Sequence, residues 1–591
     1  MRRLRGAPTP GLRPHPVRLL ASGGDWRGLV RGGDDPRVTT LSELAGAGDA
    51  IARTSSKSEK VRILAQFLAA IDESELAQAT RYFGGGVFPA GDQRTLQVGG
   101  AAFSSVLRTV SGADDSTIRA AWRRHSDTGD VTGDLLARVE GRVTSPISIH
   151  DLDHAFAEIA GTRTARERTG LLTALLGRVT PDEARYIAKL ITGELRIGLR
   201  EGLVEEAVAT AFGATSDAVG RAVMLTGDIG EAALLTRAGR LEDAAPHWFV
   251  PLRSMLATPV VDAAEAVARL GEDVWVEDKY DGIRCQLHRR GAVAALYSRD
   301  LKNVSAQFPE ITDAAMRLHA DVMLDGEILA FHDGRVMPFH ALQTRLGRVS
   351  PSADVMASVP VIYVAWDVLK VSDEVLIDLP LRERRARLEA LMVPHPLALA
   401  HLERVRGEAE IDRRFDDARA RLNEGLLLKQ PESPYTPGRR GLNWLKLKRP
   451  LDTLDVVVVG AEWGHGKRRG VLSDVTFAVR IDDTDQLATI GKAYTGLTDV
   501  EIAEMTALLQ DITIADHGHY RTVEPRIVLE IAFDAVQVSA RHKSGFALRF
   551  PRIARWRHDK SPADIDMLSR VRDLANAIEH ERVQLVDQTG A

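Results

Sequence analysis

Hydrophobic residues recur with a helical period in the first part of the chain. In Ser58–Ile71 they are spaced three and four positions apart, so that a helix would present them on one face. Thr180-Pro181-Asp182-Glu183 has the composition of a helix start, because Thr can cap the helix, Pro suits its first turn and Glu completes a capping box. Such signals recur between Gly-containing breaks from Thr40 to about Leu241. The pattern predicts an all-α domain, residues 39–245.

The pattern changes to short apolar runs after Pro246. Val274-Trp275-Val276 and Val361–Ala365 are rich in β-branched and aromatic residues, which is typical of buried strands. Between them, His332–Arg335 has the residues of a hairpin turn. Because helical stretches are interleaved with these strands, residues 246–450 are predicted to form an α+β domain.

Short strands also dominate the chain after Pro450. They are separated by glycines and charged loops, and they comprise Asp455–Gly460, Val475–Arg480 and Ile527–Phe533. Strands of this length and spacing suit a small barrel, and the position in the chain suggests an OB-fold. Residues 451–591 are therefore predicted to form a β-barrel domain.

Composition and charge agree with a soluble protein of several domains. At 591 residues the chain is too long for one hydrophobic core, and its 44% hydrophobic and 27% charged residues are ordinary values. The single cysteine, Cys285, excludes a disulfide framework and a four-cysteine zinc module and fits a reducing cytoplasm. No run approaches the roughly 18 apolar residues of a membrane span. Because the formal net charge is -5, binding to nucleic acid would have to use local basic patches.

Residues 1–38 contain eight arginines, several Pro and Gly residues and only short apolar clusters. This composition predicts a flexible basic tail. The tail could add weak, salt-sensitive contacts to DNA. A disordered extension without a role fits the same residues equally well.

The most informative stretch is Glu277–Arg284. It lies between an apolar run and an alternating one, which predicts a tight loop joining two strands, with Lys279 in the loop. Gly282 permits the close approach of a ligand, and Arg284 and Glu277 place opposite charges near the amine. A lysine beside cations and bound phosphate can lose its proton near neutral pH and act as a nucleophile. An ordinary turn with solvated charges has the same local sequence.

Further short motifs follow in a fixed order. They are Ser298-Arg299-Asp300, Leu324–Glu327, Ala365–Leu369, Glu424–Lys429, Trp444–Lys448 and, near the end, Leu548–Arg552 with Asp559-Lys560. Together with Glu277–Arg284, this set resembles the covalent nucleotidyltransferases, and most closely the ATP-dependent DNA ligases of the archaeal and eukaryotic type. The resemblance extends from about Thr40 to Asp564. It implies a helical DNA-binding domain, a nucleotidyltransferase domain of two ATP-grasp-like antiparallel sheets facing a nucleotide cleft, and an OB-fold domain that carries the C-terminal motif.

The resemblance also implies a reaction. Lys279 would attack the α-phosphate of ATP and expel pyrophosphate, and AMP would then pass to the 5′-phosphate of a nick. The 3′-hydroxyl would finally join the strands and release AMP. Each step is phosphoryl transfer, so the protein mainly positions groups and neutralises charge.

Matching the motifs assigns residues to this chemistry. The residues implied for binding ATP are Glu277 near the adenine, Arg284 and Arg299 near the ribose or the nick phosphate, Trp366 stacked on the base, and Glu327, Lys429, Arg440, Lys446 and Lys448. Glu327 and Glu424 would hold Mg²⁺, which prefers oxygen ligands. The family more often has Phe or Tyr in place of Trp366, and Trp preserves the aromatic face.

Basic residues outside the cleft are implied in contacts with nicked duplex DNA. Arg196 and Arg200 lie in a Gly-punctuated helical stretch that could expose backbone amides to phosphates. Lys467 and Arg468 lie in a glycine-lined loop. Each segment is also typical of an ordinary helix connection or a solvated loop.

The C-terminal motif is implied in the first chemical step. Arg549, Arg552 and Lys560 would orient the β- and γ-phosphates and stabilise departing pyrophosphate. The resemblance further implies a monomer that works on DNA in the cytoplasm, associated with the nucleoid and not with a membrane. The sequence identifies no recruiting protein.

Other functions fit part of this sequence. An mRNA capping enzyme would lack the large helical domain, and an RNA ligase would usually lack the full C-terminal motif. An NAD-dependent DNA ligase would need a nicotinamide-binding module and a zinc finger. A catalytically silent DNA-binding clamp could keep the fold, but it would not need Lys279, Glu327, Glu424, Lys446 and Lys448 together.

Overall fold

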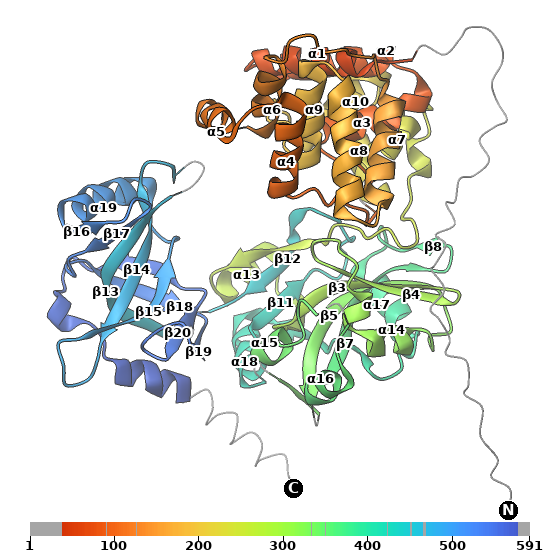
Figure 1. Ribbon diagram of the computed structural model, residues 1–591. Coiled ribbons are helices and arrows are strands. Elements are labelled where there is room, and N and C mark those ends of the chain that lie inside the picture. Colours follow the sequence, from red (N-terminus) through yellow and green to blue (C-terminus); the bar gives the residue numbers. More distant parts are fainter. Residues whose placement is uncertain are drawn as a thin grey trace, which may run out of the picture.

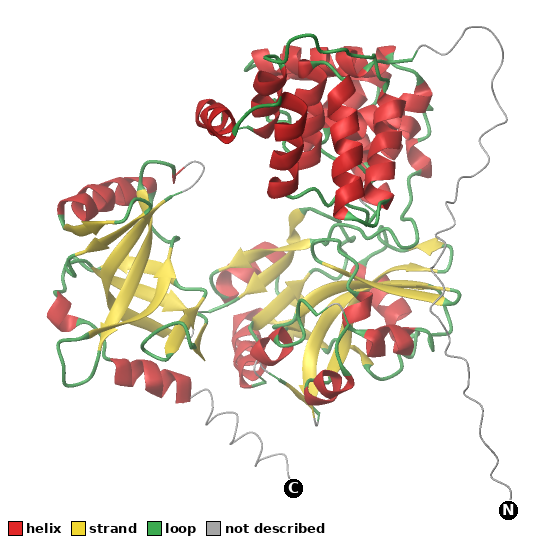
Figure 2. Ribbon diagram, viewed as in Figure 1, coloured by secondary structure: helices red, strands yellow, loops and turns green. Residues whose placement is uncertain are grey.

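The computed structural model describes residues 38–576, apart from positions 90, 126, 333, 338, 349, 422, 450, 451 and 465–467. Its elements gather into three bodies that follow one another along the chain (Figures 1 and 2). The first body is helical, the second contains strands and helices, and the third consists mainly of strands. The predicted basic tail falls almost wholly on residues 1–37, outside the described residues. No helix in the described part is long and apolar enough to cross a membrane.

The N-terminal domain is a bundle of helices. Their bounds are α1 Leu41–Arg53, α2 Lys57–Ala70, α3 Glu73–Phe83, α4 Gly100–Ser111, α5 Asp115–Arg124, α6 Thr128–Leu136, α7 Ile149–Gly161, α8 Ala165–Arg178, α9 Pro181–Thr192, α10 Glu201–Phe212, α11 Ser216–Thr226, α12 Ile229–Arg237 and the 3-10 turn η1 Leu241–Asp243. The helix predicted over residues 58–71 is α2. The predicted capping box starts α9, where the Thr180 hydroxyl accepts from the Glu183 amide and the Glu183 carboxylate accepts from the Thr180 amide. The all-α prediction is confirmed.

The central domain contains two sheets. The first has the strand order β1-β12-β11-β2-β10, with β1 Leu256–Val260, β2 Asp273–Lys279, β10 Leu402–Arg406, β11 Gly425–Lys429 and β12 Arg440–Leu447. The second has the order β4-β3-β5-β7-β8, with β6 beside β5 and β9 beside β7: β3 Ile283–Arg290, β4 Val293–Ser298, β5 Val322–His332, β6 Arg335–Val336, β7 Val361–Val371, β8 Glu374–Val375 and β9 Leu397–Leu399. The helices are α13 Ala263–Leu270, η2 Ser305–Gln307, α14 Pro309–Ala315, α15 Phe339–Gln343, α16 Ala353–Ser358, α17 Leu381–Glu389 and α18 Gly407–Ala420.

Most neighbouring strands in these sheets are antiparallel, but two pairs are not. β1 runs parallel to β12, and β7 runs parallel to β9. Long segments separate the partners of each pair, including α17 between β7 and β9, and such crossover connections permit parallel pairing. The expectation of purely antiparallel sheets is therefore wrong at these two places.

Alternation along the first sheet separates an apolar face from a polar one. The apolar face packs against α13 and α18 and contains Val274, Val276, Leu426, Leu428, Leu445 and Leu447. Successive side chains of a strand point to opposite sides. The register of β2 and β11 therefore brings Glu277, Lys279 and Lys429 out together on the other face.

The C-terminal domain is built around a long central strand. Its sheet has the order β15-β14-β13-β17-β16, with β18 paired to β13 and to β21, and β19 and β20 form a separate hairpin. The bounds are β13 Asp452–Trp463, β14 Leu472–Arg480, β15 Leu487–Ala493, α19 Asp499–Asp511, β16 Thr513–Asp516, β17 Tyr520–Val523, β18 Val528–Phe533, β19 Ala535–Val538, β20 Phe546–Arg549, β21 Arg552–Trp556 and the 3-10 turn η4 Pro562–Asp564. The three predicted strands correspond to β13, β14 and β18. The prediction of a C-terminal β domain is confirmed.

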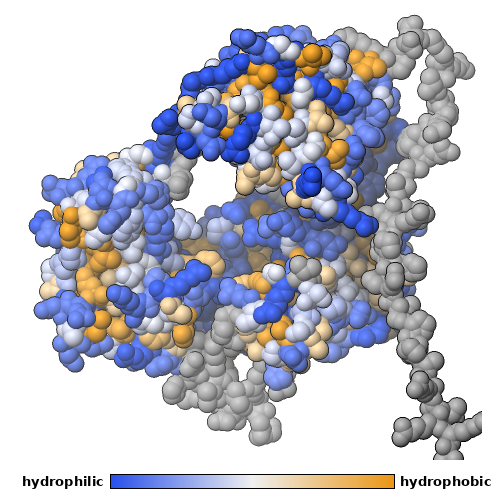
Figure 3. Space-filling model, viewed as in Figure 1, coloured by the Kyte–Doolittle hydropathy of each residue, from blue (hydrophilic) through white to orange (hydrophobic). Residues whose placement is uncertain are grey.

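Polar contacts join the helical body to the central one. Arg253 donates twice to Glu201 of α10, at 2.7 and 2.8 Å, and Arg221 of α11 pairs with Asp378 at 2.5 Å. Exposed ion pairs contribute at most about 1 kcal/mol each, so these two add little to the junction. The space-filling view shows an opening between the helical and C-terminal bodies (Figure 3).

A buried ion pair between Arg384 and Asp367 ties α17 to β7 and suggests a test of the central domain. Arg384 donates to both Asp367 oxygens at 2.8 and 2.9 Å, and both side chains are 0% exposed. Removing one partner of a buried pair typically costs about 3–5 kcal/mol. We expect Arg384→Met to lower the temperature of thermal unfolding by several degrees in scanning calorimetry. Arg382→Met, at an exposed position on the same helix, should leave it unchanged. Equal temperatures for the two variants would contradict this account.

Candidate active site

Lys279 is the last residue of β2 and lies on the polar face of the first sheet. Its partner across the ladder is Gly425, and its carbonyl oxygen accepts from the Glu424 amide at 2.8 Å. A Cβ atom at Gly425 would lie 2.2 Å from the Leu447 carbonyl oxygen, so only glycine fits between the neighbouring strands. The sequence predicted Lys279 inside a loop. The structure instead fixes it at the strand end and leaves residues 280–282 for the turn.

The Glu424 carboxylate connects two lysines. It accepts from Lys279 Nζ and from Lys448 Nζ, and Lys448 directly follows β12. Burial opposes the charge on Glu424, but the two ammonium groups outweigh burial and lower the pKa of this carboxyl group. Glu424 is therefore ionised at neutral pH, and its carboxylate keeps the amines of Lys279 and Lys448 close together.

Further cationic side chains lie near these two lysines. Burial lowers the pKa of Lys446, and the charges of Lys279, Lys448, Arg440 and Arg299 lower it further. Repulsion among like charges is relieved when an anion binds between them. This part of the polar face is therefore suited to the phosphates of a nucleotide.

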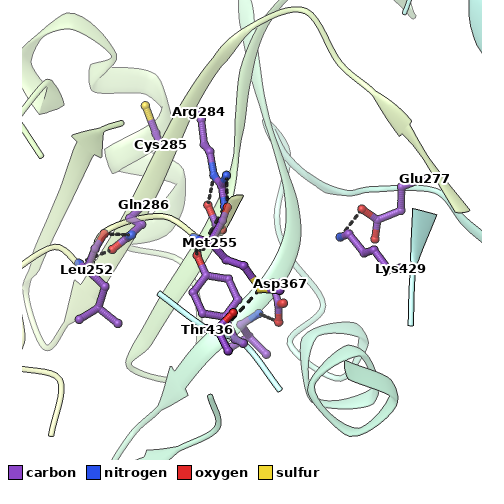
Figure 4. Close-up of polar contacts among 12 residues, drawn as sticks. Leu252, Met255, Glu277, Arg284, Cys285, Gln286, Asp367, Lys429 and Thr436 are labelled. Atoms are coloured by element: carbon purple, nitrogen blue, oxygen red, sulfur yellow. Dashed lines mark hydrogen bonds and ion pairs between the residues drawn. The ribbon is translucent and has the colours of Figure 1, made fainter. Parts of the chain in front are cut away.

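The second sheet supplies Arg284, Glu327 and Trp366. Arg284 of β3 is paired in register with Glu327 of β5. Trp366 is the extra residue of a bulge in β7, where the β5–β7 register shifts, and bulges often re-aim side chains beside active sites. Arg284 donates to Asp325 at 3.0 and 2.6 Å and to the Met255 carbonyl oxygen at 2.7 Å (Figure 4). The Cζ atom of its guanidinium lies 5.3 Å from the centroid of the Trp366 ring, so Arg284 restricts the position of that ring.

Glu327 has an unusually high pKa. Burial raises the pKa of this carboxyl group to about 7, Lys279 and Arg284 act against the rise, and Glu424 adds to it. The Gly282 amide donates to Glu327 Oε1 at 3.0 Å. Glu327 therefore titrates near neutral pH, under the influence of the second carboxylate.

The two carboxylates can be tested as ligands for a metal ion. The described residues contain no group of three or more His, Cys, Asp and Glu side chains placed to hold one. Mg²⁺, however, usually takes one or two carboxylates and completes its shell with waters and substrate phosphates. The electrostatic repulsion that Glu424 exerts on Glu327 fits a cation shared between these residues and a nucleotide.

Three family models match consecutive parts of the chain. The model described as "DNA ligase N terminus" matches residues 40–209, "ATP dependent DNA ligase domain" matches residues 254–448, and "ATP dependent DNA ligase C terminal region" matches residues 468–560. The chain belongs to the ATP-dependent DNA ligase family. The predicted enzyme class and its reaction, the ATP-dependent sealing of nicks in DNA, are confirmed.

Relatives match almost the entire ligase. A Koribacter versatilis protein named "Probable DNA ligase" is 44% identical over 567 residues, which span 92% of this chain and 98% of that one. A "DNA ligase" of Archaeoglobus fulgidus is 35% identical over 545 residues, 90% of this chain and 98% of that one. The solved structure described as "Pmar-Lig_Pre." has a TM-score of 0.53 at 15% identity and covers 87% of this chain and 99% of that one. This last similarity concerns the fold alone.

Lys429 of the ligase is enclosed by other side chains. Its Nζ lies 2.5 Å from Glu277 Oε2 (Figure 4), 4.2 Å from the ring centroid of Trp444 and 6.0 Å from that of Trp366. The structure thus groups Lys429 with Glu277 and Trp366, the residues expected beside the adenine. It does not join Lys429 to the lysines around Glu424.

The C-terminal domain of the ligase reaches the central domain through Arg549. Arg549 donates to both oxygens of Asp281, at 2.8 Å to one of them, and its guanidinium lies 5.0 Å from the Phe339 ring. Asp281 is two residues beyond Lys279. Arg549 of the C-terminal motif therefore lies beside the turn that follows the proposed nucleophile.

The other two C-terminal residues have different surroundings. Arg552 Nη1 lies 3.8 Å from one carboxylate oxygen of Asp534. The other oxygen of Asp534 lies 3.8 Å from Nζ of Lys448, in the central domain. Lys560 instead pairs at 2.5 Å with Asp455 of β13, inside the C-terminal domain. The structure brings Arg552 to the junction with the central domain and gives Lys560 a partner elsewhere.

The residues expected to contact DNA lie in two domains. Arg196, between α9 and α10, has a φ of 51° and donates to Glu194 at 2.7 Å. Arg200 is exposed at the N-cap of α10. Arg468 donates to the Tyr494 carbonyl oxygen at 2.6 Å, and Lys467 lies outside the described residues.

Sequence reasoning missed Asp281, Asp325 and Tyr435 as site residues. Asp325 binds Arg284 and accepts from the Tyr435 hydroxyl at 2.7 Å. Asp281 and Asp325 both lie inside motifs identified in the sequence, and this position could have marked them as site residues. Tyr435 has no comparable signal, because its partner Asp325 is 110 residues away in the chain.

The raised pKa of Glu327 determines how pH acts on the ligand-free protein. Between the ordinary value of 4.5 and about 7, the folded state keeps a proton that the unfolded state has lost. This contribution to the free energy of unfolding is complete below about 4.5 and is lost as the pH rises to about 7. We therefore expect the unfolding temperature of the wild type to fall, relative to Glu327→Gln, across that interval. Thermal unfolding without nucleotide or divalent metal measures the unfolding temperatures of both proteins. A difference between them that does not change with pH would contradict the raised pKa of Glu327.

Proposed function

We propose that Lys279 forms the covalent bond to AMP. Its Nζ attacks the α-phosphorus of ATP, the bond to the bridging oxygen breaks, and pyrophosphate leaves with the electron pair while Nζ gives up a proton. The adenylate then passes to the 5′-phosphate of a nick, and the 3′-hydroxyl displaces AMP. The observation that carries this proposal is the contact of Lys279 with Glu424 among several cations, which can orient the amine and neutralise the triphosphate.

The remaining cations of the cleft are assigned to phosphate groups. Lys446 and Lys448 would bind the α-phosphate region, and Arg299 and Arg440 would bind the ribose or the neighbouring phosphates. The lowered pKa of Lys446 supports this, because it reflects cations close enough to repel one another. Arg284 is committed to Asp325 and would act mainly by holding the Trp366 ring in place for stacking on the base.

Glu327 and Glu424 are assigned to Mg²⁺. The metal, when bound, supplies positive charge that stabilises the developing charge on the phosphate oxygens. Glu327 has to be ionised for this, and its pKa near 7 implies that metal binding releases a proton from part of the population at neutral pH. Glu424 would share its oxygens between the metal and the two lysines.

We infer that the C-terminal domain is an OB-fold that closes over ATP in the first step. Arg549 and Arg552 would then orient the β- and γ-phosphates, and the contact of Arg549 with Asp281 supports this role. Lys560 could join them only by leaving Asp455. The domain would swing away afterwards so that DNA can enter.

The helical domain, residues 39–245, is proposed to hold duplex DNA beside the adenylation domain, residues 246–450, and the C-terminal domain, residues 451–591. Arg196 and Arg200 of the helical domain and Arg468 of the C-terminal domain would contact phosphates of the duplex. The exposed position of Arg200 at a helix N-terminus supports such a contact. The enzyme would act as a monomer, since these domains together can supply every role in the reaction.

Lys279→Ala separates the first step from the last. The variant should form no adduct with labelled ATP, because the nucleophilic amine is missing. It should still seal a nick that already carries AMP, because this reaction needs no lysine nucleophile. Gel assays of both reactions measure this, and a labelled adduct in the variant would remove Lys279 from its role.

Arg549→Ala should affect the two reactions unequally. Loss of a cation that stabilises departing pyrophosphate should slow adduct formation about 100-fold, whereas sealing of a pre-adenylated nick should change much less. Arg555→Ala is the matched control, because Arg555 pairs with Glu530 inside the C-terminal domain. Rate constants for both reactions are measured on all three proteins. Equal losses in Arg549→Ala would contradict the closure step.

A further inference from the structure

The turn that carries Arg299, residues 298–303, follows β4 and contains a strained residue. The Ser298 amide donates to the Lys302 carbonyl oxygen at 2.9 Å, and the Leu301 amide donates to the Ser298 carbonyl oxygen at 2.8 Å. Leu301 has a φ of 61°, in the left-handed region that residues other than glycine rarely adopt. A strained backbone of this kind persists only where the surrounding structure holds it.

The side chain of Arg299 depends on this turn for its position. Among the residues that the structure describes, none forms a hydrogen bond or an ion pair with the Arg299 guanidinium. Its charge nevertheless helps to lower the pKa of Lys446, so the guanidinium lies close to the cations of the cleft. The place where Arg299 can meet a ligand is therefore set by whatever holds its backbone.

Apolar packing does not hold the turn on the side of the helical domain. A cavity of about 370 Å³ lies there, and it is lined by Phe88 and Glu201 of the helical domain and by Leu301 and Arg253 of the central domain. Leu301 thus borders open space, and its side chain lacks the close contacts of a packed core on this side. Polar contacts are left to fix the turn.

One side chain of the helical domain supplies such contacts at two points of the turn. Gln93, between α3 and α4, donates from Nε2 to the Leu301 carbonyl oxygen at 3.1 Å, and its Oε1 accepts from the Asn303 amide at 3.0 Å. The planar amide therefore binds the backbone on both sides of Lys302, much as a neighbouring strand would. The helical body lies against the part of the central domain that contains β3 and β4 (Figure 1).

Gln93 is itself placed by a short turn of the helical domain. The Asp92 amide donates to the Pro89 carbonyl oxygen at 2.8 Å, and the Asp92 carboxylate accepts from the amide of Arg94 at 2.9 Å and from its side chain at 2.8 Å. The Cζ atom of Arg94 lies 4.6 Å from the centroid of the Phe88 ring. Contacts made from a preorganised segment lose little conformational entropy, so the Gln93 amide is presented in a fixed direction.

We propose that Gln93, in the helical domain, is a positioning residue for Arg299 in the nucleotide cleft. The inference rests on the proposed function, in which Arg299 binds the ribose or the neighbouring phosphates of ATP. By holding the turn at Leu301 and Asn303, Gln93 keeps the Arg299 guanidinium where ATP can meet it. The helical domain thus contributes to the reaction with ATP, which needs no DNA, in addition to its proposed contact with the duplex.

The test is a double-mutant cycle on adduct formation from ATP in single turnovers, without DNA. Gln93→Met keeps the length of the side chain and removes both hydrogen bonds. We expect it to raise the ATP concentration for the half-maximal rate about fivefold, and Arg299→Ala to raise this concentration further. The double variant should equal Arg299→Ala alone, because Gln93 acts only through Arg299. A residue that merely stabilised the domain junction would add its own effect in both backgrounds.

Gln97→Met is the matched control, because it makes the same chemical change in the same segment. The Gln97 carbonyl oxygen accepts from Arg168 inside the helical domain at 3.1 Å, and this backbone contact survives the substitution. The ATP concentration for the half-maximal rate should stay at the wild-type value. A fivefold rise in this control would show that the segment responds to any substitution, and would overturn the specific role of Gln93.

The remaining outcomes separate the inference from the proposed function. Gln93 is exposed, and substitutions at exposed positions rarely alter stability much; thermal unfolding checks this for every variant. Gln93→Ala removes the same amide and replaces Gln93→Met in the cycle if that variant misfolds. A wild-type ATP dependence in a Gln93 variant, or effects that multiply in the double variant, would overturn the inference. A wild-type ATP dependence in Arg299→Ala would instead refute the role proposed for Arg299, and the inference with it.

Discussion

The Glu424 carboxylate accepts from two lysines on different strands, and the arrangement of the cleft depends on this contact. Lys279 is the last residue of β2 and Lys448 directly follows β12. The carboxylate therefore links the ends of the two strands that flank β11. Without a shared anion, the two ammonium groups would repel each other and the nearby Lys446. One ionised carboxylate thus permits a dense group of cations, and the remaining positive charge is available to phosphates.

The same contact links the chemistry to the position of the C-terminal domain. Lys448 lies near Asp534, and Asp281, beside the nucleophile, is bound by Arg549. Polar groups at this junction can exchange partners when a triphosphate arrives, because they form exposed or half-buried pairs and not an apolar core. The Lys429–Glu277 pair has the opposite character, because both of its side chains are buried.

Much of this could be predicted from the sequence, because the motifs carry short-range information. The helices and strands follow from local patterns, and the expectation that Lys279 and Glu424 share one cleft came from the resemblance of the ordered motifs to a known family. Contacts between distant residues could not be predicted in this way: Lys429 and Glu277 are 152 positions apart, and Arg549 and Asp281 are 268 apart. Local alternation predicts which face of the sheet a side chain lies on but not which charged group it contacts, so Lys429 was expected to bind ATP without any indication that it pairs with Glu277. The parallel pairings of β1 and β9 likewise depend on the path of the whole chain.

The most direct test of this account is the location of AMP in the protein after incubation with ATP and a divalent metal ion. Peptide mass spectrometry of the intact, unmutated chain can assign the adduct to one residue. The account predicts AMP on Lys279 alone, because the amine at the end of β2 is the proposed nucleophile. AMP on Lys446 or Lys448 would contradict it, since these lysines were assigned to bind phosphate and not to attack it.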